Sequence, residues 1–390
     1  MLPLDSEQCR DILIVAGEAS GDLHGSHLIK AAAAHHPHLK FSGVGGDKMV
    51  AAGCRILFPS DELSVMGVVE VINQLPKIYR RFKQLKRILN GTQRPDLLIL
   101  IDFPDFNLRL AKVAKAVGIP VLYYISPKVW AWRSGRAKVI ANRVDRLALI
   151  FPFEPEIYSP LGVKADYVGN PLLDEFVENQ PTGELRHRLG IKPEEQVVGI
   201  FPGSRNSELE HILEALVETA QLLHQQKPEV QFLIPVAPSL SREVIEQRFS
   251  KTTLPVFIVE ENIYEVAAAC DAVLTVSGTV TLQIALVGTP MAILYKVAPL
   301  SYALGKRLIK IEFAGLTNIV AGRGIVREFI QDDAQPPEMC AEVLRLLDDS
   351  DYTEEVQKNL AEVRQTLGAP GCSTRVAAIA AAMTTSPLYE

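Results

Sequence analysis

Short apolar runs separated by amphipathic stretches recur along most of the chain, and they constrain its fold more than any other feature. The runs that predict strands in the first half are residues 11–16, 40–44, 96–101, 120–125 and 146–151. Helices are expected between them, near residues 23–34, 75–90, 107–117 and 134–143. Strands that alternate with helices predict parallel sheets, because each crossover must return the chain to the same edge.

The alternation is interrupted at residues 174–184, where Pro, Gly, Asn and four acids occur together. It then resumes with apolar runs at residues 196–201, 231–236, 254–259, 271–276 and 290–295, and helices near 338–348, 352–367 and 372–383. A chain of 390 residues is long enough for two cores. The sequence therefore predicts two α/β domains, at residues 1–173 and 185–367, joined by a linker at 174–184.

Residues 272–295 contain no charged side chain and are long enough to span a bilayer. Polar residues and turn formers divide this stretch, notably Ser277, Gln283 and the Gly-Thr-Pro turn at 288–290. It is therefore interpreted as a buried strand-helix-strand unit.

Composition excludes several classes of protein. The net charge of −6 argues against a nucleic-acid partner, which usually calls for a basic surplus. The five cysteines are scattered and contain no C-x-x-C pair, which favours free thiols in a reducing cytosol over disulfides or a zinc site. The first eleven residues are too polar and acidic for a signal peptide. We expect a cytoplasmic protein that is soluble or peripheral to a membrane.

Ligands of parallel α/β sheets bind beyond the carboxyl ends of the strands. In the first half this rule selects Gly17, Glu18, Asp102 and Ser126. In the second half it selects the segments PGSR (202–205) and SGT (277–279). If the two domains face each other, these residues line one cleft.

Two acids follow the apolar run at 97–101, in the stretch IDFPDFN. Asp105 stands where the next helix should begin and is predicted to be its N-cap. Asp102 ends the strand itself, where neighbouring apolar groups would partly desolvate its carboxylate. Asp102 is therefore the candidate general base for a hydroxyl nucleophile.

Anion-binding helix starts are predicted twice in the second half. Gly203, Ser204 and Arg205 combine close backbone approach, helix N–H groups and a guanidinium, which suits a diphosphate. Ser277 and Thr279 are expected to cap a second helix start. The alternative is that these residues only form turns and caps. The ATP and NAD signatures G-x-x-x-x-G-K-[ST] and G-x-G-x-x-G are absent from the sequence.

A basic segment at residues 75–94 holds seven Lys or Arg and no acid, with apolar residues at helical spacing. It follows an apolar stretch at 63–72 that includes Met66. Either the helix packs on the core with a solvated basic face, or Arg80, Arg81 and their neighbours contact an anionic membrane surface. A second basic-apolar segment lies at residues 301–313.

The motifs GEASGD (17–22), IDFPDFN (101–107), SPKVWAWR (126–133), PGSR, SGT and TNIVAGR (317–323) occur together and in order. With these motifs the sequence resembles the lipid-A-disaccharide synthase family of glycosyltransferases, from about residue 11 to near the C-terminus. The resemblance implies the GT-B architecture, in which two Rossmann-like domains face across a cleft. It also implies that the last helix, about residues 368–390, packs back on the first domain.

The reaction implied by the resemblance joins UDP-2,3-diacylglucosamine to 2,3-diacylglucosamine 1-phosphate. It forms the β-1,6-linked lipid A disaccharide 1-phosphate and UDP, with inversion at the anomeric carbon. No metal and no cofactor are implied, since helix termini and basic residues stabilise the UDP leaving group. The two lipid substrates imply a peripheral enzyme on the cytoplasmic face of the inner membrane.

The resemblance also assigns roles to residues. Asp102 and Glu18 match catalytic positions of the family, and Asn318 and Arg323 match its nucleotide-side motif. The nucleotide-sugar-binding candidates are completed by Gly203, Ser204, Arg205, Ser277, Gly278, Thr279 and Gln283. Related GT-B enzymes usually place a glutamate where this chain has Gln283, which changes the expected ribose contact. The acceptor and membrane side is assigned to Met66, Arg80, Arg81, Ser126 and Trp130.

Two other functions fit the same architecture. A UDP-N-acetylglucosamine 2-epimerase would use no lipid and would not need the apolar surface near residues 63–89. A non-catalytic nucleotide-sugar binder would not need Asp102. The C-terminal helices could pack in cis or swap between chains to form a homodimer.

Overall fold

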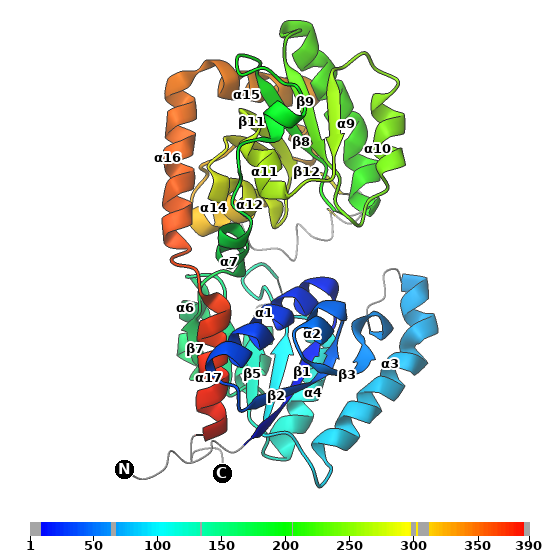
Figure 1. The fold of residues 1–390 in the computed structure, drawn as a ribbon, viewed down its shortest axis with the longest axis vertical. Coiled ribbons are helices and arrows are strands. Elements are labelled where there is room, and N and C mark those ends of the chain that lie inside the picture. The colour runs from blue at the N-terminus through cyan, green and yellow to red at the C-terminus, as the bar shows by residue number, and fades with distance from the viewer. Residues whose placement is uncertain are drawn as a thin grey trace. The chain divides into compact units, whose positions relative to one another are not determined.

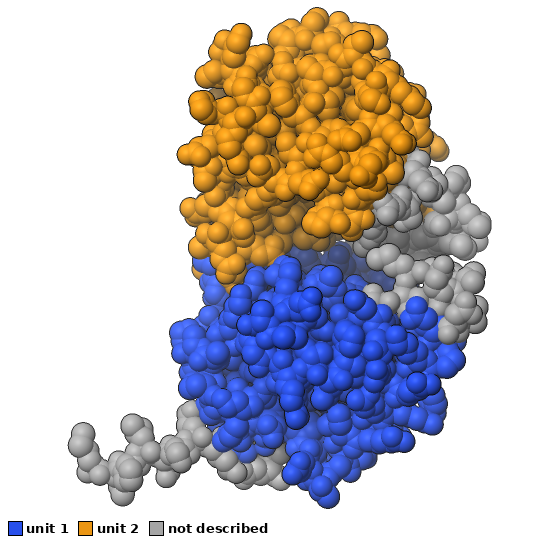
Figure 2. All heavy atoms as spheres, turned by 45° about the vertical axis from the view of Figure 1, so that its right-hand side comes forward, with its two compact units in different colours: residues 1–171, 370–390 blue, residues 172–369 orange. Residues whose placement is uncertain are grey.

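The computed structural model describes residues 9–63, 68–132, 135–204, 206–297, 302 and 312–385. The chain divides into two compact units, coloured separately in Figure 2. Unit 1 comprises residues 1–171 and 370–390, and unit 2 comprises residues 172–369.

Unit 1 is built on a seven-stranded parallel sheet, here sheet A (Figure 1). Its strands, in spatial order, are β3 (Arg55–Pro59), β2 (Leu39–Gly45), β1 (Arg10–Ala16), β4 (Leu97–Ile101), β5 (Val121–Tyr124), β6 (Arg146–Leu149) and β7 (Lys164–Tyr167). Its α-helices are α1 (Ala19–His35), α2 (Asp47–Ala51), α3 (Val68–Leu89), α4 (Pro104–Ala116), α5 (Arg136–Ala141), α6 (Glu154–Tyr158) and α17 (Cys372–Thr385), with 3-10 turns η1 (Ser60–Glu62) and η2 (Ser159–Leu161).

Both faces of sheet A are covered by helices, which explains why β4 is apolar throughout. Leu97, Ile99 and Ile101 join one apolar cluster with residues of α1 and α17. Leu98 and Leu100 join a second cluster with residues of α3 and α4. A parallel strand buried on both faces has no position for a polar side chain. Figure 1 shows the C-terminal α17 beside α1.

Unit 2 is built on a six-stranded parallel sheet, here sheet B. Its strands, in spatial order, are β10 (Val256–Val259), β9 (Gln231–Pro235), β8 (Val197–Phe201), β11 (Ala272–Val276), β12 (Met291–Tyr295) and β13 (Glu328–Ile330). Its described helices are α7 (Pro171–Glu178), α8 (Leu185–Arg188), α9 (Asn206–Gln226), α10 (Arg242–Phe249), α11 (Ile263–Ala268), α12 (Val280–Val287), α14 (Leu316–Ala321), α15 (Pro336–Asp348), α16 (Ser350–Thr366) and the 3-10 turn η3 (Gln331–Asp333).

The predicted α/β class and parallel sheets are confirmed, and every predicted strand is present. The stretch 272–295 forms β11, α12 and β12, as predicted. Strands β3, β7 and β13 were missed. The segment 174–184, expected as a linker, begins inside α7. It is tied to unit 2 through Thr182, which donates from its backbone N–H and its hydroxyl to the carboxylate of Glu265, at 2.6 and 3.0 Å.

Candidate functional site

The strand order of sheet A reverses between β1 and β4, and such a switch point is where ligands of open α/β sheets bind. Ala16 at the end of β1 pairs with Ile101 at the end of β4. The residues that follow these two, Gly17 and Asp102, therefore leave the sheet side by side. Two of the predicted positions thus share one point of the rim.

Asp102 lies in a strained turn that is held by hydrogen bonds to its carbonyl oxygen. Its φ is +43° and that of Phe103 is +48°, a left-handed conformation that is rare for residues other than glycine. The Asp102 carbonyl accepts hydrogen bonds from Asn107 Nδ2 at 2.8 Å and from the Tyr123 hydroxyl at 2.5 Å. Strain of this kind persists where the surroundings over-determine the backbone, and it gathers at functional sites.

The environment of the Asp102 carboxyl suits a proton acceptor. Burial raises its pKa, the charge of Glu18 raises it further, and the ammonium of Lys128 and the backbone N–H of Phe103 act against that rise. A carboxylate with a raised pKa binds a transferred proton more readily than a solvated one. Glu18 is exposed and occupies the N-cap position of α1 without a side-chain capping bond.

Two nearby acids have structural roles. Asp105 is not the N-cap of α4, as was predicted, because Phe103 holds that position; Asp105 lies in the first turn and pairs with Arg136. Asp22 lies within α1, and its carboxylate accepts from backbone N–H groups at the start of α2.

The segment that follows β5, residues 126–132, is held by α6. The hydroxyls of Ser126 and Tyr158 hydrogen-bond to each other, and both side chains are buried. The indole Nε1 of Trp130 donates to Glu154 Oε1 at 3.2 Å, and the indole ring lies edge-on to Phe151 and Phe153. Ser126 and Trp130, both assigned to the acceptor side, therefore have partners inside unit 1.

The remaining acceptor-side positions lie on or before α3. Arg80 is exposed. Arg81 makes a two-pronged contact with Glu62, at 2.6 and 2.9 Å, and lies over the ring of Phe58. It therefore ties α3 to the 3-10 turn η1. Met66 lies outside the described residues.

Sheet B has its own switch point, between β8 and β11. Thr275 of β11 pairs with Phe201 at the end of β8, so the PGSR and SGT segments leave the sheet together. Gly203 has a φ of +90°, a conformation that only glycine adopts without strain. The Ser204 carbonyl accepts from the Ser239 hydroxyl at 2.6 Å, and Arg205 lies outside the described residues.

The prediction that Ser277 and Thr279 cap the following helix is wrong. Thr279 holds the N-cap position of α12, yet its side chain makes no capping bond. The Ser277 hydroxyl donates instead to the Ala314 carbonyl at 2.7 Å. Gly278 lies in the same turn, and Gln283 is close enough to Tyr264 to act against the burial that raises the pKa of that hydroxyl.

Asn318 uses all its side-chain hydrogen-bonding groups inside unit 2. Its amide nitrogen donates to the Val326 carbonyl and to Glu328 Oε1, and its oxygen accepts from the backbone N–H groups of Ile325 and Val326. Glu328 also accepts from the backbone N–H groups that precede α14. Arg323 is exposed and pairs with Glu362 at 2.7 Å. Asn318 therefore fixes the shape of residues 318–328, which connect α14 to β13.

Sequence reasoning did not find the residues that support these positions, which include Asn107, Tyr123, Lys128, Glu154, Tyr158 and Glu328. Most of these residues lie in a different helix or strand from the residue that they support, so their spacing in the sequence does not indicate the contact. Lys128 stood inside the quoted motif SPKVWAWR, but nothing in the motif related it to Asp102.

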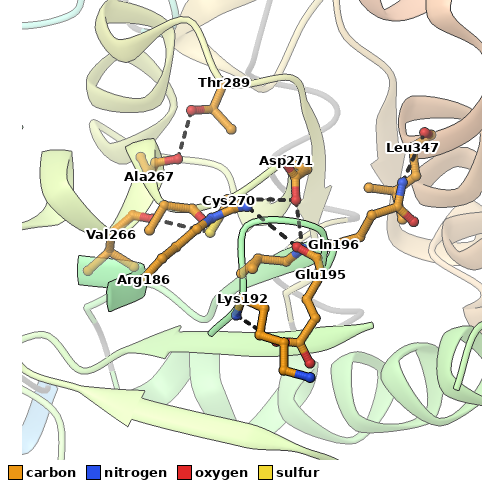
Figure 3. A network of polar contacts seen from close by, with 12 residues as sticks. Arg186, Lys192, Glu195, Gln196, Val266, Ala267, Cys270, Asp271, Thr289 and Leu347 are labelled. Atoms are coloured by element: carbon orange, nitrogen blue, oxygen red, sulfur yellow. Dashed lines mark hydrogen bonds and ion pairs between the residues drawn. The ribbon is translucent and has the colours of Figure 1, made fainter. Parts of the chain in front are cut away.

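A cavity of about 550 Å³ lies at the amino ends of the strands of sheet B, opposite the carboxyl ends where the site residues lie. It is lined by residues that include Gln196, Cys270 and Thr289. Figure 3 shows the polar network here. Asp271 accepts from Arg186 Nη2 and from the Val197 backbone N–H, both at 2.7 Å, and Arg186 Nε donates to the Ala269 carbonyl. These bonds tie the chain that enters unit 2 to the amino ends of β8 and β11.

Two general findings apply to the described part of the chain. It contains no group of three or more His, Cys, Asp or Glu side chains arranged to hold a metal ion. Among its helices, none combines the length and the apolar character needed to cross a membrane.

Known structures share this fold. The UDP-N-acetylglucosamine 2-epimerase of Neisseria meningitidis, solved with UDP-GlcNAc bound, aligns with a TM-score of 0.64 at 13% identity, covering 95% of this chain and 99% of that one. The calicheamicin glycosyltransferase aligns with a TM-score of 0.59 at 16% identity, covering 96% and 98%. At these identities the likeness shows the fold alone, which is the GT-B arrangement of two Rossmann-like domains.

Sequence relatives identify the family. A lipid-A-disaccharide synthase from Syntrophotalea carbinolica is 56% identical over 371 residues, which cover 95% of each chain. One from Geobacter metallireducens is 49% identical over 368 residues, covering 94% of this chain and 96% of the relative. The family model described as lipid-A-disaccharide synthetase matches residues 12–382. The chain belongs to this family of glycosyltransferases.

Proposed function

We propose that this protein transfers 2,3-diacylglucosamine from UDP to the 6-hydroxyl of 2,3-diacylglucosamine 1-phosphate. The acceptor oxygen forms a bond to the anomeric carbon as the bond from that carbon to the UDP oxygen breaks. The hydroxyl proton passes to the carboxylate of Asp102, and UDP leaves as the anion. The configuration at the anomeric carbon inverts because the attack is direct.

The observation that carries this proposal is the setting of Asp102 in a chain of this family. The carboxyl follows the switch point of sheet A, in a turn braced by Asn107 and Tyr123, and burial raises its pKa. Glu18 leaves the same point of the rim from β1. Its charge keeps Asp102 basic, so Glu18 assists the proton transfer.

The donor is assigned to the switch point of sheet B. Gly203 and Ser204, together with Arg205, the next residue in the sequence, are assigned to the diphosphate at the start of α9. Gly278 and Thr279 open α12 beside them, and Gln283 is assigned to the ribose. Helix termini and a guanidinium stabilise the UDP anion without a metal ion or another cofactor.

Lipid substrates imply a peripheral position on the cytoplasmic face of the inner membrane, and α3 is the proposed contact. Its apolar stripe packs on the core of unit 1, with Leu85 and Leu89 fully buried. The outward face of α3 leaves Leu75 and Tyr79 more than half exposed, and Arg80 is exposed next to Tyr79 in the chain. An anionic surface would attract this face chiefly through its positive charge.

The test of the reaction is UDP release from UDP-2,3-diacylglucosamine with and without the acceptor, followed by mass analysis of the lipid. Acceptor-dependent UDP and a matching disaccharide are expected. Asp102→Asn should reduce the rate by about two to four orders of magnitude, as expected for loss of a general base. The matched control is Asp105→Asn, three residues away on an exposed ion pair, which should stay near the wild-type rate.

Other outcomes would reject the proposal. Full activity of Asp102→Asn would refute its role as the base. UDP release that does not depend on the acceptor would indicate hydrolysis. Consumption of UDP-N-acetylglucosamine in place of the acylated donor would favour the epimerase.

The membrane contact is tested by liposome flotation. The protein should float with vesicles that contain anionic lipid and less with neutral ones, and Arg80→Glu should reduce flotation. Lys30→Glu is the control, because Lys30 is exposed on α1, which covers the other face of sheet A. Equal flotation of the two variants would refute α3 as the contact.

A further inference from the structure

Helix α6 holds the 126–132 segment at two points. Glu154 and Tyr158 are four residues apart, so they lie on the same side of α6. Tyr158 bonds to Ser126 at the beginning of the segment, and Glu154 bonds to Trp130 four residues further on. Both side chains are almost completely buried. The segment is therefore fastened on both sides of Lys128.

Glu154 is itself fixed from two directions. Its Oε1 accepts from the Trp130 indole, and its Oε2 accepts from the backbone N–H groups of Phe151 and Ile150, at 3.0 and 3.2 Å. A buried carboxylate with three donors has one orientation, since any rotation would leave donors without a partner. This fixes the indole of Trp130.

Lys128 links this anchor to the base. Its side chain is exposed, yet its charge acts on both Asp102 and Glu154. The two carboxylates belong to different elements, the end of β4 and the start of α6. Lys128 is thus placed near both by the segment that α6 holds.

We propose that Glu154 and Tyr158 are positioning residues, which hold the 126–132 segment so that the Lys128 ammonium acts on the carboxylate of Asp102. The ammonium stabilises the ionised base and so sets the pH above which the enzyme works. This inference rests on the proposed role of Asp102.

Glu154 also makes the anchor sensitive to pH. Burial raises its pKa to about 7, whereas the bonds from Phe151, Trp130 and Ile150 and the charge of Lys128 act against that rise. The ionisable groups that interact with it are Lys128 from the segment, Tyr158 on the same helix and Tyr167 on β7. Protonation of Glu154 puts a hydrogen on one oxygen, which then cannot accept as before and loosens the segment.

The first test is the pH profile of kcat/KM. Lys128→Gln should move the acid limb to higher pH, because the ionised form of Asp102 loses a stabilising charge, and added salt should reduce the difference from wild type. Lys138→Gln is the matched control, as an exposed lysine of α5, and its profile should coincide with that of wild type. An unchanged acid limb in Lys128→Gln would overturn the proposal.

The second test uses tryptophan fluorescence. The chain has two tryptophans, so Trp132→Phe leaves Trp130 as the reporter. Its emission should titrate with a midpoint near pH 7, and Glu154→Gln should abolish that titration, because an amide does not ionise. The amide also turns a donor toward one of the three N–H groups, which weakens the anchor. The same change should lower kcat about tenfold, the usual effect of losing one hydrogen bond to a charged group.

Glu265→Gln is the matched control for that change. Glu265 is also a buried glutamate that accepts backbone N–H groups, but it lies in unit 2. It should leave the titration of Trp130 and the acid limb unchanged. If Glu154→Gln does not fold, Tyr158→Phe, which removes only a hydroxyl, should lower kcat in its place.

The outcomes separate this inference from the function on which it rests. If wild type releases no UDP, the proposed function fails, whereas the emission of Trp130 still tests the anchor. If wild type is active and Asp102→Asn is not, but Glu154→Gln and Tyr158→Phe retain full kcat, the positioning role is refuted and the function stands.

Discussion

Replacing Asp22 with alanine should lower the free energy of unfolding of unit 1, because three backbone N–H groups lose their acceptor. Asp22 is 6% exposed, and it receives bonds from Gly46 at 2.6 Å, from Met49 at 3.1 Å and from Lys48 at 3.2 Å. These N–H groups belong to the start of α2, a helix of five residues that cannot bond them itself.

The magnitude follows from these bonds. A hydrogen bond to a charged group contributes about 1.5–3 kcal/mol, and removal of a helix cap costs about 0.5–2 kcal/mol. The short bond from Gly46 and the buried bond from Met49 should dominate. We therefore expect a loss of about 3–4 kcal/mol for Asp22→Ala. Asp22→Asn should lose about half as much, because one oxygen can still accept.

The assay is urea unfolding followed by tryptophan fluorescence. Both tryptophans, Trp130 and Trp132, belong to unit 1, so the signal reports the unit that contains Asp22. Asp47→Ala is the control, since Asp47 is exposed in the first turn of the same helix and interacts mainly with the helix dipole, worth about 0.3–1 kcal/mol. A loss for Asp22→Ala no larger than that of the control would refute this account of the carboxylate.

Two further predictions concern stability. A Cβ on Gly17 would lie 2.4 Å from the ring of Phe103, so Gly17→Ala should lower the free energy of unfolding by about 1–3 kcal/mol. Phe103→Ala in the same chain should remove that extra loss, and additive losses in urea unfolding would contradict this contact. For Glu154, burial raises the pKa from 4.5 to about 7, so the protonated form is favoured in the folded state and stability is lost as the pH rises through this range. Between pH 5 and pH 8 wild type should lose about 2–3 kcal/mol relative to Glu154→Gln, and a constant difference would show that Glu154 does not titrate in this range.

Much of the fold could be predicted because buried parallel strands have a plain signature. The run LLILI is apolar at every position, since β4 packs helices on both faces. The missed strands β3, β7 and β13 lie at sheet edges and are three to five residues long. An edge strand needs few apolar residues, so KADY and EFI resemble loops in the sequence.

The residues that directly follow the strands could be predicted from the sequence, whereas the residues that support them could not. Asp102 and Gly203 follow apolar runs, and the carboxyl-end rule selects them without tertiary information. The capping roles failed because several side chains can serve the same backbone groups. Asp22 lies inside α1, yet its carboxylate bonds to the start of α2, twenty-four residues later. No local pattern relates Asp22 to Gly46.

The turns at the two switch points differ in the residues that carry a positive φ, and the difference agrees with the ligand proposed for each. At sheet B the positive φ falls on Gly203, which has no side chain, as expected where backbone N–H groups must reach an anion. At the switch point of sheet A the positive φ falls on Asp102 and Phe103, which bear side chains and adopt this conformation at a cost. A base must point a carboxylate at one oxygen, and a glycine there could not do so. In the proposed mechanism the strained turn carries the side chain of the base, and the bonds from Asn107 and Tyr123 hold that turn in place.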